Sequence, residues 1–215
     1  MKYWLKNSRN FYIFGLIFTS SMVALSYFFL DLSLSSYYRK LNGSFVHHFF
    51  EYVTKGGDSL PYIIIALFGY LIFKYFRKNQ EYASKFLLIL ESVAISGIAA
   101  DLLKWIAGRY RPCKFFDDNL YGFDFFHIQF AFVSFPSGHT ATAFAFAAAM
   151  AYLFPKKQWI WWVFAILVGF SRIVLIDHYL SDVIGGAFVG IASVVFILTH
   201  QEKFRLSFVK KNFEI

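Results

Sequence analysis

Six long apolar runs constrain this chain more than any other feature of its sequence. They lie near residues 11–30, 60–76, 84–103, 138–154, 158–176 and 183–199. A helix needs about 20 apolar residues to cross a bilayer, so each run has about the length of one crossing. The composition, with 58% hydrophobic and 16% charged residues, also differs from that of a soluble domain. The sequence therefore predicts an all-α protein, an integral membrane bundle of six transmembrane helices, with residues 1–215 forming a single membrane-embedded domain.

Basic residues predict how the bundle is oriented. In a six-helix layout one face collects Lys2, Lys6, Arg9, Arg77, Lys78, Lys85, Lys156, Lys157, Lys203, Arg205, Lys210 and Lys211. The positive-inside rule makes this face, with both termini, cytoplasmic. The first run is expected to stay as a helix rather than to be removed as a secretory signal, since no small-x-small cleavage site follows it. The net charge of +8 is split between two membrane faces, which argues against a nucleic-acid partner.

Cysteine and histidine residues show no spacing typical of a metal site. Cys113 is the single cysteine, so the chain can form no intrachain disulfide, and no second thiol completes a zinc-ligand pattern. His47 and His48 are adjacent and lack the i, i+4 spacing of two helical metal ligands, so surface or interfacial positions are expected for them.

Three short clusters combine cations, histidines and a glycine on the face opposite the basic one. They are Lys104 with Arg111 and Pro112, then Pro136-Ser137-Gly138-His139, then Ser171-Arg172 followed by His178 and Asp182. Cationic side chains and backbone N–H groups bind phosphate oxygens, while histidine can attack phosphorus or protonate a leaving oxygen. The three clusters together predict a phosphate pocket that needs no metal for phosphoryl transfer.

Lys104 and Arg111 are seven residues apart, which would place them about 10 Å apart on nearly one face of a continuous helix. The residue before Pro112 disfavours helical geometry, so the helix is expected to end near Gly108 and Arg111 to reach back from the loop. Asp101 lies three residues before Lys104 and is expected to orient its side chain.

Ser137 and Gly138 come directly before an apolar run, where the N-terminus of a helix would present unpaired N–H groups to an anion. Ser137 has two candidate roles, as the N-cap of this helix or as a direct phosphate contact. His139 is the candidate general acid, because histidine titrates in the useful range.

His178 and Asp182 are four residues apart, so they would share a face if the last helix began there. The carboxylate could then accept the imidazole N–H and leave the other ring nitrogen free to attack phosphorus. Asp177 is a rival partner for the imidazole. The planar fork of Arg172 can hold two phosphate oxygens, a task for which lysine would be a poor substitute.

In order and spacing, Lys104-x6-Arg111-Pro112, Pro136-Ser137-Gly138-His139 and Ser171-Arg172-x5-His178-x3-Asp182 resemble the signature of the type 2 phosphatidic acid phosphatase superfamily. Its membrane branch has six helices, in agreement with the apolar runs. The resemblance implies that His178 is the nucleophile and forms a phosphohistidine, which water then hydrolyses. It also implies catalytic roles for His139 and Asp182 and phosphate binding by Lys104, Arg111, Ser137, Gly138 and Arg172.

Within this superfamily, Gly108-Arg109-Tyr110-Arg111-Pro112, the acidic pair Asp117-Asp118 and Leu120-Tyr121-Gly122-Phe123 resemble the bacterial branch that contains lipid A phosphatases. This implies removal of the 1- or 4′-phosphate of lipid A at the periplasmic face of the bacterial inner membrane. Phosphatidylglycerol phosphate and undecaprenyl pyrophosphate remain alternative substrates. A non-enzymatic alternative is a phospholipid-binding or transport protein, which would release no phosphate.

The aromatic segment at residues 113–135 and the acidic residue Glu91 each have two possible interpretations. Residues 113–135 are rich in phenylalanine and tyrosine, which suits either packing of a lid over the pocket or contact with lipid. Glu91 lies within an apolar run, either in a buried hydrogen bond or at the cytoplasmic interface. The predicted partners are a membrane lipid phosphate and the bilayer, with no cofactor and no obligate protein partner.

Overall fold

The computed structural model describes residues 8–213, and every regular element in that range is helical. The predicted all-α class is therefore confirmed. Each of the six predicted apolar runs falls on one of the long helices α2 (Ser8–Phe29), α5 (Ser59–Leu71), α6 (Gln80–Ala107), α8 (Gly138–Leu153), α9 (Gln158–Val174) and α10 (Leu180–Phe213). A π-helical turn, η2 (Ile72–Phe76), continues α5.

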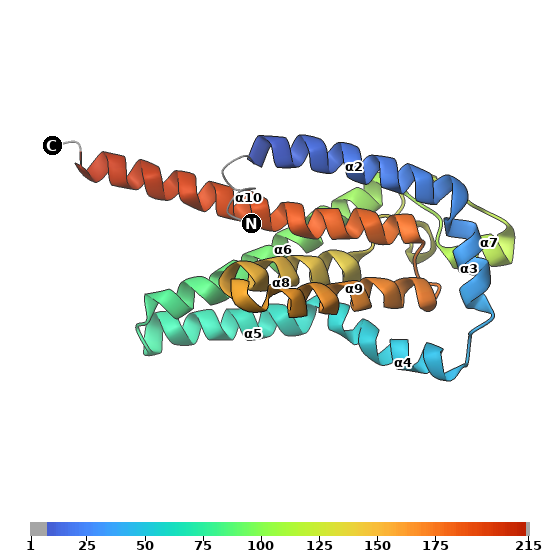
Figure 1. Ribbon diagram of the computed structural model, residues 1–215, viewed down its shortest axis with the longest axis horizontal. Coiled ribbons are helices and arrows are strands. Elements are labelled where there is room, and N and C mark those ends of the chain that lie inside the picture. The colour runs from blue at the N-terminus through green and yellow to red at the C-terminus, as the bar shows by residue number, and fades with distance from the viewer. Residues whose placement is uncertain (1–7, 214–215) are drawn as a thin grey trace.

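The long helices run side by side along the long axis of the molecule, with α2 beside α10 and α5 beside α6 (Figure 1). By length and apolar composition, four helical stretches within the described residues could cross a membrane: Ser8–Phe29, Phe45–Phe76, Gln80–Ala107 and Leu180–His200. The helices α8 and α9 have 16 and 17 residues and are shorter than these four.

The helices α8 and α10 pack through their smallest residues. Alanines of α8 are fully buried, among them Ala141 and Ala145. A Cβ atom on Gly190 would lie 2.4 Å from the carbonyl oxygen of Ala141, and one on Gly186 would lie 2.5 Å from that of Ser137. Backbones that approach this closely leave no room for side chains, as in other membrane helix pairs with small residues four apart.

The two predicted outer connections contain short helices that the apolar pattern did not predict. Within residues 31–59 these are α3 (Asp31–Arg39), α4 (Phe45–Val53) and the 3₁₀ turn η1 (Thr54–Gly57); within residues 105–136 they are α7 (Pro112–Asp118) and η3 (Phe130–Phe132). The helices α3, α4 and α7 lie at the end of the bundle where α6 ends and α8 begins (Figure 1). This end carries the candidate site.

The end of α6 agrees with the predicted boundary at Gly108. This residue caps the helix with φ of 56°, and its N–H donates to the carbonyl oxygen of Lys104 at 2.9 Å. A Cβ atom there would lie 1.8 Å from the carbonyl oxygen of Asp124. Glycine therefore allows both the left-handed turn and the close return of the loop.

Candidate functional site

The predicted pair of His178 and Asp182 is present, although the geometry differs from the one expected. The helix α10 begins at Leu180, so His178 lies in the turn before it rather than on its face. Nδ1 of His178 lies 3.5 Å from Oδ2 of Asp182, and both side chains are buried. The backbone N–H of His178 donates to the carbonyl oxygen of Arg172 at 3.1 Å, which fixes the turn.

Arg109 holds the other side of the Asp182 carboxylate, a role that the sequence did not predict. It is fully buried, with Nη1 2.5 Å from Asp182 Oδ1 and Nη2 2.7 Å from Asp31 Oδ2. Ser134 donates to Asp182 Oδ2 at 2.6 Å, and the backbone N–H of Tyr179 donates to the same oxygen at 2.9 Å. Three donors therefore hold Asp182 and fix the carboxylate that faces His178.

Arg111 is nearly buried, and carbonyl groups hold it. Its Nε donates to the carbonyl oxygen of Phe130 at 2.8 Å, and its Nη1 donates to that of Asp177 at 3.1 Å. Within residues 8–200, no carboxylate forms an ion pair with this guanidinium. The Arg111 charge is therefore available to an anion.

Arg172 is held beside His178 by two partners. Its Nη2 lies 2.9 Å from Asp177 Oδ2, and its Nη1 donates to the hydroxyl of Thr54. Asp177, the rival partner considered for His178, thus pairs with Arg172. The Nε atom of Arg172 is buried and has no hydrogen-bond partner among the described residues. A buried donor of this kind costs free energy unless a ligand accepts from it.

Burial lowers the pKa of His178 to about 3, and the nearby Arg111 and Arg172 charges act in the same direction. Asp182 opposes this effect without overcoming it. The imidazole is therefore neutral near pH 7. One of its ring nitrogens then carries a free lone pair, which a nucleophile requires.

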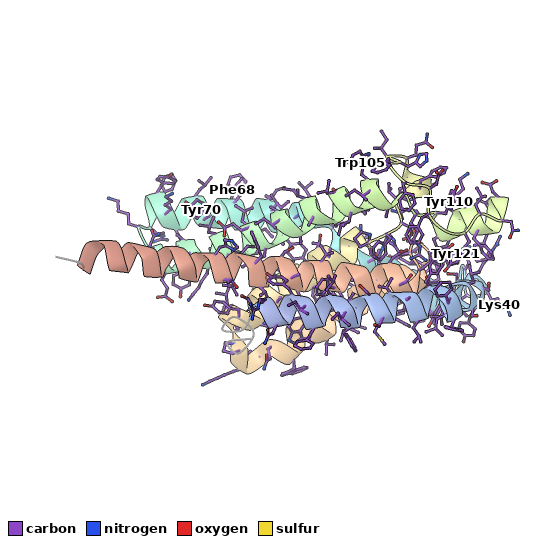
Figure 2. All side chains as sticks on the ribbon, turned by 90° about the horizontal axis from the view of Figure 1, so that it is seen from above. Lys40, Phe68, Tyr70, Trp105, Tyr110 and Tyr121 are labelled. Atoms are coloured by element: carbon purple, nitrogen blue, oxygen red, sulfur yellow. The ribbon has the colours of Figure 1, made fainter. Side chains whose placement is uncertain are left out.

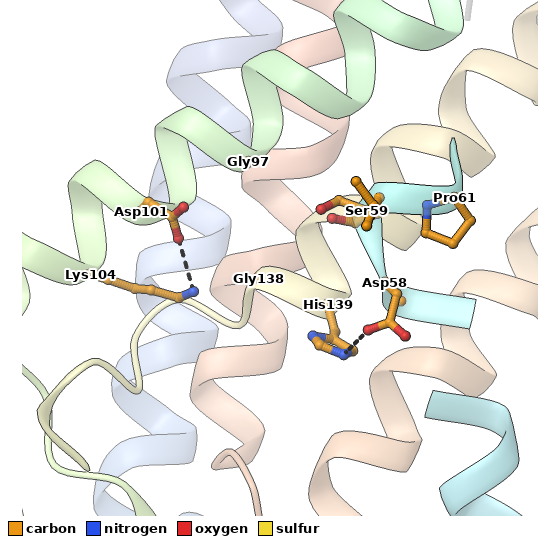
Figure 3. A pocket seen from close by; sticks show the side chains of 11 residues that line it. Asp58, Ser59, Pro61, Gly97, Asp101, Lys104, Gly138 and His139 are labelled. Atoms are coloured by element: carbon orange, nitrogen blue, oxygen red, sulfur yellow. Dashed lines mark hydrogen bonds and ion pairs between the residues drawn. The ribbon is translucent and has the colours of Figure 1, made fainter. Parts of the chain in front are cut away.

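Ser137 is the N-cap of α8, one of the two roles predicted for it. Its hydroxyl accepts from the N–H of Thr140 at 3.4 Å and from the hydroxyl of Thr140 at 2.9 Å. Next to it, a Cβ atom on Gly138 would lie 2.9 Å from Nζ of Lys104. Glycine thus lets an ammonium group approach the N-terminus of α8 (Figure 3). Lys104 also pairs with Asp101 at 3.1 Å, as predicted.

His139 pairs with Asp58, which the sequence did not single out. Its Nε2 lies 3.0 Å from Asp58 Oδ1. A Cβ atom on Gly57 would lie 2.6 Å from Cβ of His139, so the turn η1 packs directly on this histidine. The sequence offered one signal for Asp58, because it lies in an outer connection just before an apolar run, where functional loops are common.

A cavity of about 530 Å³ opens beside Lys104, Gly138 and His139. Its other walls come from the start of α5 and from α6 (Figure 3). The predicted site residues thus form two neighbouring groups, one at this cavity and one around Arg111, Arg172 and His178. The turn η1 connects the two groups, because its Thr54 accepts from Arg172 and its Gly57 packs directly on His139.

The aromatic segment between α6 and α8 both packs and remains exposed. Tyr121 stacks on Tyr27 at a centroid distance of 4.7 Å and donates to its carbonyl oxygen at 2.7 Å. Phe126 and Phe130, in contrast, are largely exposed. Tyr110 and Tyr121 lie near one end of the molecule, where Lys40 also lies (Figure 2). Of the two predicted roles, packing is therefore compatible with Tyr121, and contact with lipid is compatible with Phe126 and Phe130.

One group of side chains in the described part of the chain has the spacing for a metal ion. It consists of His47, His48 and Glu51, whose ligand atoms all lie within 4.8 Å of one another. The adjacent histidines alone gave no signal of this group in the sequence, because its third member, Glu51, lies on the next helical turn. These residues lie on α4 and line neither part of the candidate site.

Glu91, which was expected either in a buried hydrogen bond or at the cytoplasmic interface, is half-buried in α6.

Comparison with known proteins gives consistent matches. A profile described as the PAP2 superfamily matches residues 85–206. Lipid A 1-phosphatase of Rhizobium johnstonii is 40% identical over 155 residues, which are 67% of this chain and 64% of that protein. Lipid A 1-phosphatase of Rhizobium etli is 36% identical over 185 residues, which are 81% of this chain and 78% of that protein.

Two solved structures share the fold. The crystal structure of Aquifex aeolicus LpxE superposes with a TM-score of 0.60 at 22% identity, covering 79% of this chain and 94% of that one. The PAP2 type phosphatidylglycerolphosphate phosphatase from Bacillus subtilis gives 0.56 at 22% identity, covering 91% and 95%. The matched profile covers more than half of the chain and includes all three motifs. The chain therefore belongs to the PAP2 superfamily.

Proposed function

We propose that this protein hydrolyses the phosphomonoester of a membrane lipid, and that its substrate is the 1-phosphate of lipid A. One observation carries the phosphatase proposal. Arg111 and Arg172 are buried beside a neutral His178, Arg111 has no carboxylate partner within residues 8–200, and Nε of Arg172 has no acceptor there. A phosphate would supply both the missing charge and the missing acceptor.

The proposed first step transfers the phosphoryl group to His178. Lys104, Arg111, Arg172 and the backbone N–H groups at Ser137 and Gly138 hold the phosphate oxygens. The imidazole nitrogen that does not face Asp182 attacks phosphorus, and the bond from phosphorus to the lipid oxygen breaks. Asp58 and the dianionic phosphate stabilise the protonated form of His139, which donates its proton to that oxygen, so the lipid leaves as an alcohol.

In the second step water attacks the phosphohistidine. His139, now neutral, accepts a proton from the water, and inorganic phosphate leaves His178. Asp182 stays ionised throughout and stabilises the imidazole, since Arg109 and Ser134 hold its oxygens. The three cations of Lys104, Arg111 and Arg172 neutralise the charge that develops on the phosphate, so the scheme routes no step through a metal.

Two relatives named lipid A 1-phosphatase support the choice of substrate, because they match most of this chain. Removal of the 1-phosphate places the reaction at the anomeric end of a glucosamine disaccharide. The 4′-phosphate, phosphatidylglycerol phosphate and undecaprenyl pyrophosphate use the same phosphoryl chemistry. They therefore become competing substrates in the test below.

We further propose that residues 1–215 form one domain with six membrane crossings in the bacterial inner membrane. The short helices α8 and α9 would span about 24 and 26 Å, somewhat less than the ~30 Å hydrocarbon core. Charges favour a cytoplasmic location for the connections at Arg77–Lys78 and Lys156–Lys157. The phosphate clamp, formed by Lys104, Arg111 and Arg172, lies at the opposite end of the bundle, which would then face the periplasm.

The test is inorganic phosphate release by detergent-purified protein in EDTA. The substrates are lipid A, phosphatidylglycerol phosphate, phosphatidic acid and undecaprenyl pyrophosphate, and product mass identifies the bond that is cut. We expect the highest kcat/KM for lipid A and loss of release in His178→Ala. Phosphate release by His178→Ala at the wild-type rate would contradict the nucleophile. Binding without release from any lipid would favour the non-enzymatic alternative.

A further inference from the structure

We propose that the cavity beside His139 binds the part of the lipid head group that is attached directly to the scissile phosphate. This part is uncharged, donates hydrogen bonds and has at least the size of one hexosamine ring. This inference rests on the proposed function, because that function places the phosphate at the clamp. A group esterified to that phosphate must extend from the N-terminus of α8. Lys104, Gly138 and His139 form the shared wall between this N-terminus and the cavity (Figure 3).

The cavity has room for a group larger than glycerol. Its volume of about 530 Å³ lies within the range of ~300–1,000 Å³ that is usual for organic ligands. Gly97 of α6 lines this space. A Cβ atom on Gly97 would meet no atom within 4 Å, so the missing side chain does not serve helix packing. A glycine inside a helix lowers the stability of the helix by about 1 kcal/mol relative to alanine. At position 97 it leaves the space beside α6 open to a ligand.

Two carboxylates on facing walls define the charge preference. Asp58 uses Oδ1 to contact His139, and Asp101 uses Oδ1 to contact Lys104. Within the described residues, Oδ2 of each accepts no hydrogen bond, and both side chains are more than half exposed. An ionised carboxylate only accepts hydrogen bonds, so these oxygens favour hydroxyl and amide N–H groups. They repel a second phosphate beside the scissile one.

The remaining lining suits a sugar ring, which has polar edges and apolar faces. Leu60 and Pro61 provide apolar surface, while Ser59 and Thr142 provide hydroxyls. A diphosphate would bring a second anion toward Asp58 and Asp101, and a glycerol head group would leave most of the cavity empty. The chemistry of the walls therefore favours a saccharide among the candidate lipids.

The test compares Gly97→Phe with its neighbour Ile98→Phe, a matched control whose side chain is 71% exposed on the outer surface of α6. Wild type and both variants are assayed for phosphate release from lipid A and from phosphatidic acid, whose head is a single glycerol. We expect Gly97→Phe to lower the ratio of kcat/KM for lipid A to that for phosphatidic acid at least tenfold. Ile98→Phe should keep the wild-type ratio. Gly97→Leu replaces Gly97→Phe if the larger side chain prevents folding, as judged by thermal unfolding.

A second arm tests the charge preference with Asp101→Asn. We expect the ratio of kcat/KM for undecaprenyl pyrophosphate to that for lipid A to rise, because one repelling charge is removed. This inference would be overturned if wild type cleaves lipid A and Gly97→Phe keeps the same preference for lipid A over phosphatidic acid. The proposed phosphatase activity would still stand in that case. Cleavage of phosphatidic acid but not lipid A would also overturn it. Release from no lipid would instead reject the proposed function, and this inference with it.

Discussion

Two buried arginines, two residues apart, have opposite surroundings. Arg109 faces the carboxylates of Asp31 and Asp182 at 2.7 and 2.5 Å, so its charge is more than balanced. Arg111 is held by the carbonyl oxygens of Phe130 and Asp177, and within residues 8–200 no carboxylate pairs with it. A paired cation supports structure, whereas a buried cation without a counter-ion requires a ligand. We therefore expect the same residue type to serve the scaffold at one position and the substrate at the other.

Arg109→Met should have the largest effect on stability, because it leaves the buried carboxylates of Asp31 and Asp182 without their shared cation. Removal of one partner from such a network costs about 3–5 kcal/mol. We expect a clear fall in the thermal unfolding midpoint in detergent. Adding Asp31→Asn to this variant should recover part of the loss, since one uncompensated charge disappears. A midpoint equal to that of wild type would mean that Arg109 does not support the scaffold.

Arg172→Lys should affect activity rather than stability. A lysine keeps the charge but lacks the planar fork that would hold two phosphate oxygens. We expect kcat/KM for the preferred lipid to fall about 10²-fold, equivalent to about 2.7 kcal/mol, with a nearly unchanged unfolding midpoint. The opposite result, a large loss of stability with activity per folded molecule retained, would place Arg172 with Arg109 in the scaffold.

His178 provides the most graded test, through the pH dependence of stability, because its effect is small for each step of pH. An unfolded histidine binds a proton near pH 6.5, but burial lowers the pKa of His178 to about 3. Between these values the unfolded state binds more protons, so acidification should destabilise the protein by about 1.4 kcal/mol per pH unit through this residue. In His178→Gln this contribution is absent. The stability of wild type minus that of His178→Gln should therefore decrease as the pH falls from 7 to 4, and parallel curves would contradict the buried neutral imidazole.

Local sequence patterns predicted the long helices and the parts of the site that lie close along the chain. The end of α6 at Gly108, the capping by Ser137 and the pair of Lys104 and Asp101 all follow from spacings of a few residues. His178 and Asp182 also meet, although α10 begins two residues later than His178. Capping and helical periodicity act over one or two turns, so the sequence displays them directly.

The partners that the sequence did not reveal come from distant segments. Asp31 and Arg109 are separated by 78 positions, and Ser134 and Asp182 by 48. Asp58 reaches His139 from the turn between α4 and α5. A single residue that meets its partner only through tertiary packing produces no periodic pattern. Asp31 gave only a weak signal in the sequence. It is an acidic residue directly after an apolar run, and an acidic residue that is buried there requires a partner.

The close packing of Gly186 and Gly190 against α8 has a consequence for how the enzyme responds to its membrane. His139 lies at the start of α8, and His178 lies just before α10, so the distance between them depends on the register of these two helices. Contacts of backbone against backbone prevent this register from sliding. A change of bilayer thickness acts mainly on the tilt of transmembrane helices and on their lipid contacts. The distance between the two histidines should therefore not change with lipid composition. We expect the rate of the chemical step to be the same in thin and thick bilayers.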